Sequence, residues 1–276
     1  MRVAAVQLNS TDDKSRNLAV AERLVREAAA DGAELVALPE KWNLLAGGEA
    51  LVAGAEPLAG PSLGAARDWA AALGIHLLAG SISEAAGEKA FNTSVLIGPD
   101  GADIAVYRKI HMFDVDVGGV AYRESEHEEP GSEIVLAQGG ELPGLGMTVC
   151  YDLRFPELFR ILAVRGARLI AVPSAFTSTT GRDHWEVLLR ARAIENQVFV
   201  LAPNQSGKAP PHFDSYGHSS IVDPWGKVLA TAPEGECFVA ADLDLSSQEE
   251  VRESLPSLAN RRPEAYAWPQ LAEIHA

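Results

Sequence analysis

The sequence predicts a layered α/β domain, and three observations support this. Short apolar runs of strand length alternate along the 276-residue chain with longer segments whose apolar residues recur at helical spacing. Hydrophobic residues make up 47% of the chain, which is enough to form a sizeable core. No Ser/Gly-rich linker, change of composition or internal repeat divides the sequence, so we expect one domain over residues 1–276.

The elements of the first half follow from this periodicity. Segment 15–30 carries apolar residues at helical spacing and is followed by Gly32, which is typical of a helix end. Gly98-Pro99-Asp100-Gly101 is typical of a turn, so the apolar runs on either side of it should pair as a hairpin. The strands expected in this half are 3–8, 35–38, 75–81, 92–97 and 104–108. The helices expected in it are 15–30 and 63–73.

The second half begins with a long stretch, 111–131, that has no clear period. It contains Gly118-Gly119 and the acidic run 124–129. A loop of this length in a compact domain is often functional. Beyond it the alternation resumes, with strands expected at 134–136, 146–150, 169–172, 198–202, 219–222, 228–231 and 237–243. The helices expected here are 157–165 and 183–196.

Charge and cysteine content exclude several classes of function. The chain has 38 acidic and 23 basic residues, a net charge of −15, which argues against nucleic acid or an anionic membrane as a partner. No apolar run approaches the ~18–20 residues that span a bilayer, and the run 1–8 is too short for a signal peptide. Two cysteines, Cys150 and Cys237, make no disulfide framework. We therefore expect a cytoplasmic protein.

Three chemically complementary residues stand where predicted strands end. Glu40 follows the strand 35–38, Lys109 follows 104–108, and Cys150 closes 146–150. A carboxylate, an ammonium and a thiol can serve as base, oxyanion donor and nucleophile. A lone cysteine is more often a buried structural residue, which is how we interpret Cys237, since no partner motif accompanies it.

The motifs around these residues resemble those of a known family. Leu38-Pro39-Glu40, Tyr107-Arg108-Lys109-Ile110-His111 and the segment 149–156 are similar to the three motifs of the nitrilase superfamily of carbon–nitrogen hydrolases. The similarity runs from Met1 to about Tyr266. Further segments resemble the branch that contains deaminated glutathione amidase and omega-amidase; they are 173–176, 180–181, 184–195, 216–219, 223–226 and 261–263. The resemblance implies a four-layer α-β-β-α sandwich of two stacked mixed sheets.

The resemblance also implies roles for the strand-end residues. Cys150 would attack an amide carbonyl and form a thioester, and Glu40 would act as the general base. Lys109, together with the backbone N–H of Tyr151, would donate to the oxyanion, which typically lowers the barrier by roughly 3–4 kcal/mol.

The family often places a second glutamate in the loop after the lysine. Glu124 matches it best, with Glu126, Glu128 and Glu129 as nearby rivals. The loop departs from the family pattern at Gly118, where relatives commonly carry proline.

Three residues bear on the substrate. The guanidinium of Arg154, four residues past Cys150, could clamp a carboxylate, or it could form a structural salt bridge. Thr180 matches a position that helps to hold the keto-acid end of the substrate in the resembled amidases, although it could equally be a helix N-terminal hydroxyl. Lys41 either points into solvent or touches an anionic substrate. No His, Cys or carboxylate cluster has metal-ligand spacing, so we expect no metal and no cofactor.

These observations favour a cofactor-free thiol amidase that acts on a linear amide. The first substrate hypothesis is deaminated glutathione, which would give 2-oxoglutarate and cysteinylglycine. Omega-amidase activity on 2-oxoglutaramate is the alternative, and related carbamoylases and nitrilases remain open. A catalytically silent binding scaffold with the same fold is the rival from another class. The expected partners are the small-molecule amide and a second copy of the chain, in a homodimer or higher homo-oligomer as in relatives.

Overall fold

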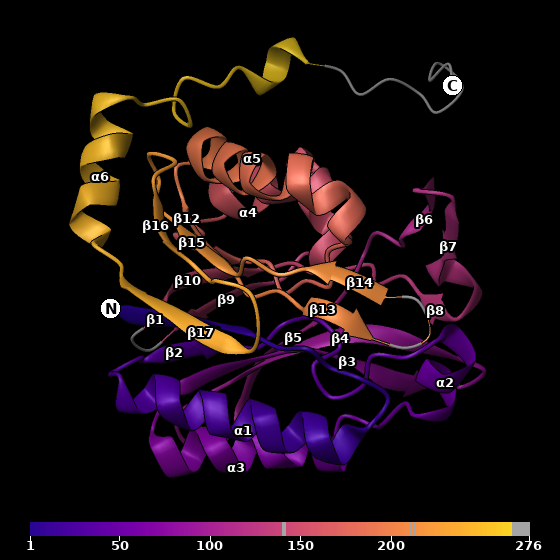
Figure 1. The fold of residues 1–276 in the computed structure, drawn as a ribbon. Coiled ribbons are helices and arrows are strands. Elements are labelled where there is room, and N and C mark those ends of the chain that lie inside the picture. Colours follow the sequence, from indigo (N-terminus) through magenta and orange to yellow (C-terminus); the bar gives the residue numbers. More distant parts are fainter. Residues whose placement is uncertain (140–141, 210, 212, 267–276) are drawn as a thin grey trace.

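Two β-sheets lie face to face between two layers of helices (Figure 1). The structure is a computed structural model and describes residues 1–139, 142–209, 211 and 213–266. The first sheet has the order β17 (Cys237–Asp242), β1 (Arg2–Gln7), β2 (Leu35–Ala37), β3 (His76–Ala86), β4 (Lys89–Ile97) and β5 (Asp103–Arg108), and β8 (Glu128–Glu129) pairs with β4. The second has the order β16 (Val228–Thr231), β15 (Ser220–Val222), β12 (Phe199–Ala202), β11 (Leu169–Ala171), β10 (Leu142–Met147) and β9 (Leu136–Gly139).

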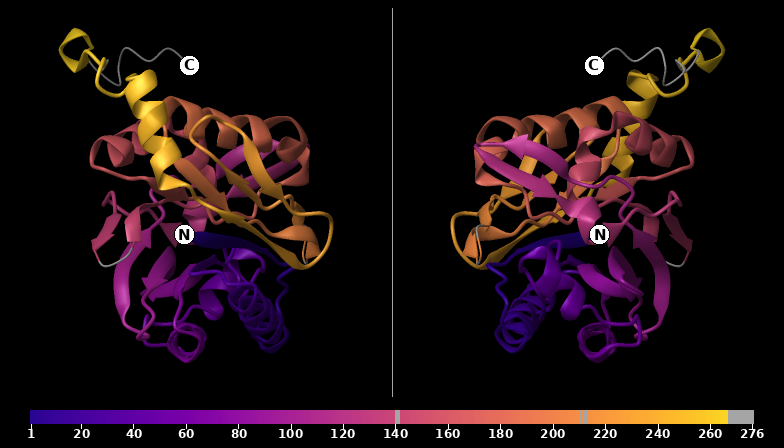
Figure 2. Two further views of the ribbon diagram at one scale, coloured as in Figure 1. Left: turned by 90° about the vertical axis from the view of Figure 1, so that its left-hand side faces the viewer. Right: turned by 90° about the vertical axis from the view of Figure 1, so that its right-hand side faces the viewer.

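Both sheets are mixed, and helices cover their outer faces. In the first sheet β1, β2 and β3 run parallel, whereas β17 is antiparallel to β1 and β4 is antiparallel to β3. Helices α1 (Lys14–Ala30) and α3 (Pro61–Leu73) cover this sheet, and α4 (Pro156–Val164) and α5 (Ser178–Asn196) cover the other (Figure 2). The four-layer α-β-β-α sandwich implied by the resemblance is therefore confirmed.

The alternation of side chains along the first strands explains this layering. On β1, Val3 and Ala5 belong to the core between the sheets, whereas Ala4 and Val6 belong to the core under α1 and α3. All four are fully buried. A strand covered on both faces must be apolar at every position, which is why the strand-like runs in the sequence are continuous rather than alternating.

Several boundaries differ from those expected. The expected strand 146–150 is wrong at its end, because β10 ends at Met147 and Cys150 opens a short 3₁₀ helix, η2 (Cys150–Arg154). The expected strand 134–136 lies later, as β9. Helix α5 begins at Ser178, five residues before the expected start. Two helices were not foreseen, α2 (Gly48–Ala53) and α6 (Leu245–Ser254).

The stretch 111–131 is not a plain loop. It forms a hairpin of β6 (Asp114–Val117) and β7 (Val120–Arg123), followed by the 3₁₀ helix η1 (Glu124–Glu126) and by β8. The hairpin turns at Gly118 and Gly119, which both have positive φ (61° and 78°). A proline cannot adopt such a φ, so the glycine at 118 suits a tight turn here. A second hairpin, β13 (Ser206–Ala209) with β14 (Phe213–Tyr216), also escaped the sequence analysis.

The C-terminal segment leaves the sandwich. After α6 the chain runs through a short 3₁₀ helix, η3 (Pro263–Ala265), which lies away from the layers (Figure 2). None of the helices in the described ranges is long and apolar enough to cross a membrane. One domain over residues 1–276 stays a prediction, and residues 267–276 lie outside the described ones.

Candidate active site

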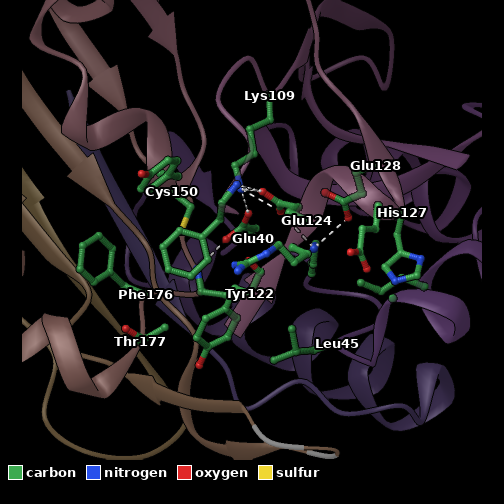
Figure 3. Close-up of a pocket in the computed structure, with 18 of the residues that line it drawn as sticks. Glu40, Leu45, Lys109, Tyr122, Glu124, His127, Glu128, Cys150, Phe176 and Thr177 are labelled. Atoms are coloured by element: carbon green, nitrogen blue, oxygen red, sulfur yellow. Dashed lines mark hydrogen bonds and ion pairs between the residues drawn. The ribbon is translucent and has the colours of Figure 1, made fainter. Parts of the chain in front are cut away.

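The three strand-end residues meet in one cavity of about 320 Å³ (Figure 3). Glu40 comes from the end of β2, Lys109 from the end of β5, and Cys150 from the first position of η2. The first two belong to one sheet and the thiol to the other, so the cavity joins the two halves of the sandwich. The other residues predicted for the site also line it; they are Glu124, Tyr151, Arg154 and Thr180.

Cys150 is buried and held in an unusual backbone conformation. Its φ is +50°, in the left-handed region, and its N–H donates to the carbonyl of Pro173 over 2.9 Å. A side chain other than glycine is strained there by roughly 1–3 kcal/mol, and such strain gathers at active sites. Burial raises the pKa of the thiol well above its usual value, the Glu40 carboxylate raises it further, and Lys109 opposes both. The resting thiol is therefore neutral and needs a base to become a nucleophile.

The turn that carries the thiol is clamped by one buried carboxylate, that of Asp152. Its Oδ2 accepts hydrogen bonds from the Tyr107 hydroxyl (2.6 Å) and the Val149 N–H (2.8 Å). Its Oδ1 accepts from the His111 N–H (3.2 Å) and lies 2.7 Å from His111 Nδ1. The His111 ring in turn stacks on Phe155, with centroids 3.5 Å apart. Asp152 thus ties the Lys109 strand to the Cys150 turn.

The Glu40 carboxylate is fixed from three sides. Its Oε1 accepts from Asn92 Nδ2 (2.8 Å) and Lys109 Nζ (3.1 Å), and its Oε2 accepts from the backbone N–H of Ala175 (2.8 Å). It acts on the Cys150 thiol both as a negative charge and as a hydrogen-bond partner. This is the geometry that a general base needs, because the carboxylate is immobile and within reach of the proton.

Lys109 is a buried cation between two carboxylates. Its Nζ lies 3.1 Å from Glu40 Oε1 and 2.7 Å from Glu124 Oε2. Burial lowers its pKa, but the attraction of Glu124 and Glu40 outweighs burial and raises the pKa well above its usual value. Lys109 therefore stays protonated and is suited to donate hydrogen bonds rather than to accept a proton. The adjacent donor expected from the sequence, the N–H of Tyr151, stands in the first turn of η2, where N–H groups lack a partner within the helix.

Of the four loop glutamates, the structure brings Glu124 to Lys109. Both of its oxygens accept from Lys109 Nζ (2.9 and 2.7 Å), and Oε2 also accepts from the N–H of Phe113 (2.8 Å). Burial raises the pKa of Glu124, but Lys109 and Lys41 outweigh this and hold it well below its usual range. Glu124 therefore remains ionised and supports the cation.

Lys41 and Glu128 form a second buried pair beside the first. The interpretation that Lys41 points into solvent is wrong, because the residue is only 8% exposed and its Nζ lies 2.8 Å from Glu128 Oε1 and 3.4 Å from Glu124 Oε1. Burial lowers the pKa of Lys41, but Glu128 and Glu124 raise it above its usual value. For Glu128, burial raises the pKa to about 7 although Lys41 opposes it, and the nearby Glu124 adds to the rise.

Arg154 and Thr180 lie with aromatic residues at another part of the cavity wall. The guanidinium carbon of Arg154 lies 5.2 Å from the ring centre of Phe176, and its Nη1 is 3.2 Å from His184 Nδ1. Within the described ranges no carboxylate pairs with Arg154, so the structural salt bridge considered above is not formed there. The Thr180 hydroxyl lies 2.9 Å from that of Thr177 and belongs to the first turn of α5.

Three residues of the site were missed at the level of the sequence. Asn92 was treated only as the start of a strand, although a buried amide in an apolar strand indicates a hydrogen-bonding task. Asp152 lies inside the cysteine motif, where its carboxylate could have been assigned to the turn. Glu128 was considered only as a rival of Glu124. Its pairing with Lys41 depends on β8, which has just two residues and no detectable period.

Comparisons with known proteins agree with this geometry. A family model described as carbon-nitrogen hydrolase matches residues 2–253. Omega-amidase NIT2 from Danio rerio is 40% identical over 267 residues, which cover 96% of each chain. Among solved structures, the C. elegans NitFhit protein has a TM-score of 0.89 and 36% identity over 96% of this chain and 66% of that one. An amidase from Nesterenkonia sp. AN1, solved as a mutant with acrylamide added at its active-site cysteine, has a TM-score of 0.81 and 26% identity over 96% of this chain and 98% of that one.

The match covers nearly all of the chain at two independent levels. The family model spans both sheets and the helices that cover them, and the 40% identity to an omega-amidase extends over 96% of the chain. The solved relatives share the same sandwich. The chain therefore belongs to the carbon-nitrogen hydrolase family of the nitrilase superfamily, and it is a hydrolase of non-peptide carbon–nitrogen bonds.

Proposed function

We propose that this hydrolase is a thiol amidase for a small linear amide that carries a carboxylate. The observation that carries the proposal is the meeting of Cys150, Glu40 and Lys109 in one cavity, with both charged groups held by hydrogen bonds. Intact nucleophile, base and cation argue against the rival of a silent binding scaffold. The cavity volume of about 320 Å³ lies at the lower end of ligand pockets, which are roughly 300–1,000 Å³, and suits a small metabolite.

The first half of the reaction forms a thioester. Glu40 takes the thiol proton while Cys150 Sγ attacks the amide carbon, and the carbonyl electrons move to oxygen. Lys109 Nζ and the N–H of Tyr151 donate hydrogen bonds to this oxyanion. As the oxyanion collapses, the carbon–nitrogen bond breaks, and the proton held by Glu40 passes to the departing nitrogen. The products of this half are a free amine, or ammonia, and an acyl group on sulfur.

The second half hydrolyses the thioester with the same groups. Glu40 takes a proton from a water molecule while the oxygen of that water bonds to the thioester carbon. Lys109 Nζ and the N–H of Tyr151 donate hydrogen bonds to the second oxyanion. The carbon–sulfur bond then breaks, the carboxylic acid leaves, and Glu40 returns the proton to the Cys150 thiolate. No step needs a metal or a cofactor.

The position of Arg154 is an argument that the substrate carries a carboxylate. It is the cation of the cavity wall without a carboxylate partner among the described residues, whereas Lys41 and Lys109 each contact two. The similarity to omega-amidase makes 2-oxoglutaramate, whose leaving group is ammonia, the first substrate to test. Deaminated glutathione, which carries the same keto-acid end, stays a prediction as the second.

The direct test is turnover of these two amides and of a neutral linear amide. Ammonia release from 2-oxoglutaramate and cysteinylglycine release from deaminated glutathione distinguish the two substrates. We expect kcat/KM for at least one of them to exceed that for the neutral amide by ~10²-fold, because the half-buried Arg154, which has no carboxylate partner among the described residues, discriminates against a substrate that leaves it unpaired. Equal turnover of the neutral amide would contradict the carboxylate site.

We also propose a homodimer, in keeping with the family expectation. Three large apolar side chains are exposed near the outer helical layer: Val187 (65%) and Ile194 (47%) on α5, and Trp225 (66%) in the turn that packs on α5. Burying such residues in a subunit contact is favourable. Val187→Asp should shift the mass measured by light scattering from dimer to monomer, and a parent protein that is already monomeric would refute the proposal. A cytoplasmic location, without nucleic-acid or membrane partners, stays a prediction.

A further inference from the structure

Five of the charged side chains that line the cavity form an alternating series, which we call the buried charge chain: Glu40, Lys109, Glu124, Lys41 and Glu128. The successive closest contacts are 3.1 Å, 2.7 Å, 3.4 Å and 2.8 Å. Every member is at most 11% exposed at its side chain. The first three members have roles in the proposed reaction. The last two, Lys41 and Glu128, have none so far.

The backbone conformation at Lys41 determines its place in the buried charge chain. Lys41 has a φ of +54°, in the left-handed region, and its N–H donates to Ser81 Oγ over 3.0 Å. The preceding carbonyl, that of Glu40, accepts from Gln205 Nε2 over 2.9 Å. This turn lets two adjacent residues, Glu40 and Lys41, occupy the first and the fourth place of the series. A strained conformation persists only where the surroundings determine it.

Glu124 depends on side-chain contacts for its position. It opens η1, a single turn of 3₁₀ helix within the hairpin segment 111–131. Lys41, in contrast, follows a central strand of the first sheet, and Glu128 is paired into the same sheet through β8. The Lys41–Glu128 pair therefore ties Glu124 Oε1 to the sheet, and Lys109 contacts both oxygens of the same carboxylate.

We propose that Lys41 and Glu128 are a positioning pair for the oxyanion donor: Glu128 holds the Lys41 ammonium against Glu124, and Lys41 thereby fixes the carboxylate on which Lys109 rests. The inference builds on the amidase function proposed above. Lys41 also shares the negative charge of Glu124, so that Lys109 is drawn less strongly away from Cys150 and Glu40.

A direct role of Lys41 in binding the substrate carboxylate fits the structure less well. Its ammonium already lies within 3.4 Å of two carboxylates, and a substrate carboxylate in that place would meet their repulsion. Arg154 offers a cation free of that competition. The two roles differ in kinetics, because a substrate ligand changes KM whereas a positioning residue changes kcat.

The test uses Lys41→Met, Glu128→Gln and the double variant. Without Lys41, the buried Glu128 is tolerated only in its protonated form, because an ionised Glu128 would repel Glu124. In the double variant the glutamine is neutral at every pH. We expect Lys41→Met to lower kcat by at least ~10-fold with KM within ~3-fold, and the loss to deepen as the pH rises.

The pH dependence of the rescue is the decisive readout. At about pH 6 the single Lys41→Met and the double variant should be equally active, and at about pH 8.5 the double variant should be at least ~5-fold faster. A merely structural ion pair would give no such pH-dependent rescue. If Lys41→Met alone does not fold, the double variant decides the question. It should fold, and its kcat should not decline as the pH rises.

A matched control separates stability from positioning. Lys14 and Glu56 form a pair of the same chemistry, with Nζ 2.5 Å from Oε1 and a Glu56 side chain only 7% exposed, but neither lines the cavity. Lys14→Met/Glu56→Gln should lower the melting temperature and leave kcat and its pH profile unchanged.

A second readout does not depend on any substrate. Iodoacetamide labelling of Cys150, followed by peptide mass spectrometry to separate it from Cys237, should be slower in Lys41→Met at a given pH and recover in the double variant. If no amide is turned over, the proposed function fails while this labelling still tests the pair. A rise in KM with kcat intact, or equal behaviour of single and double variants at both pH values in turnover and labelling, would overturn the inference.

Discussion

Replacing Asp152 by asparagine tests whether one buried carboxylate holds the catalytic turn. Asp152 accepts hydrogen bonds from two backbone N–H groups, those of Val149 and His111, one on each oxygen. The Tyr107 hydroxyl and the His111 ring can reverse their roles and accept from an amide, but a backbone N–H cannot. Whichever way the asparagine is oriented, its NH₂ group therefore faces one backbone N–H, and one hydrogen bond is lost.

The magnitude follows from that count. A hydrogen bond to a charged group contributes about 1.5–3 kcal/mol, and the remaining bonds weaken when the acceptor loses its charge, so the free energy of unfolding should fall by about 2–4 kcal/mol. Domains have about 5–15 kcal/mol of stability, so the variant should remain folded. The strained turn at Cys150 should then relax, and a displacement of about 1 Å costs roughly 10²-fold in kcat/KM.

Urea unfolding followed by circular dichroism gives the stability, and amide hydrolysis gives the activity. Asp244→Asn is the matched control, because this carboxylate caps α6 at the surface and asparagine caps equally well. The control should behave as the parent protein in both measurements. An Asp152→Asn variant with the parent's urea midpoint and turnover within ~3-fold would refute the role assigned to this carboxylate.

Four further predictions follow from the site. Glu40→Gln and Lys109→Ala should each lower kcat by at least ~10²-fold while far-UV circular dichroism stays unchanged, and near-parent turnover of either would remove it from the mechanism. Arg154→Lys should lower kcat/KM for the carboxylate-bearing amide and change that for a neutral amide little, since lysine keeps the charge but loses the two-pronged geometry; equal losses would make Arg154 a structural support. Burial places the folded-state pKa of Glu128 at about 7, above its usual 4.5, so the folded protein binds this proton more tightly than the unfolded chain does. The free energy of unfolding should therefore fall as the pH rises from about 4.5 to about 7. Glu128→Gln should remove that part of the decline in urea unfolding measured across this pH range, and an unaltered pH dependence would contradict the buried pair. EDTA should leave turnover unchanged, because every step is assigned to protein groups, and a loss restored by a divalent ion would overturn that assignment.

The local pattern of the sequence was enough to predict the sandwich and its central strands. Continuous apolar runs such as 35–38 can only be buried on both faces, and short runs separated by helical periods favour stacked α/β layers. The order of the strands is another matter. The parallel pairing of β10 with β11, for instance, is set by contacts between segments about 25 residues apart, which periodicity does not encode.

The end of the strand before Cys150 shows where local reasoning fails. Residues 146–150 are apolar or small and read as one strand, yet the chain leaves the sheet after Met147. The cause is tertiary: Asp152 accepts from the N–H of Val149, and the carbonyl of Pro173 accepts from the N–H of Cys150. Pro173 is distant from this turn in the sequence, and Asp152, which is local, is itself held by the distant Tyr107 and His111.

The second buried pair was unpredictable for a related reason. Four glutamates in the run 124–129 look alike in the sequence, and only the fold gives them different surroundings. Glu124 reaches Lys109, and Glu128 is fully buried against Lys41 because β8 turns it toward the sheet. Glu126 and Glu129 remain exposed. Which carboxylate is functional is decided by burial and by the nearest cation.

The central claim is that the amide is cleaved through a thioester on Cys150. Intact-protein mass spectrometry of a reaction quenched in acid during steady-state turnover should show the parent chain carrying the acyl mass of the substrate. Peptide mapping should place that mass on Cys150 and not on Cys237. The Cys150→Ala variant, with unchanged circular dichroism, should show neither the adduct nor turnover. Turnover by Cys150→Ala close to that of the parent would contradict the mechanism.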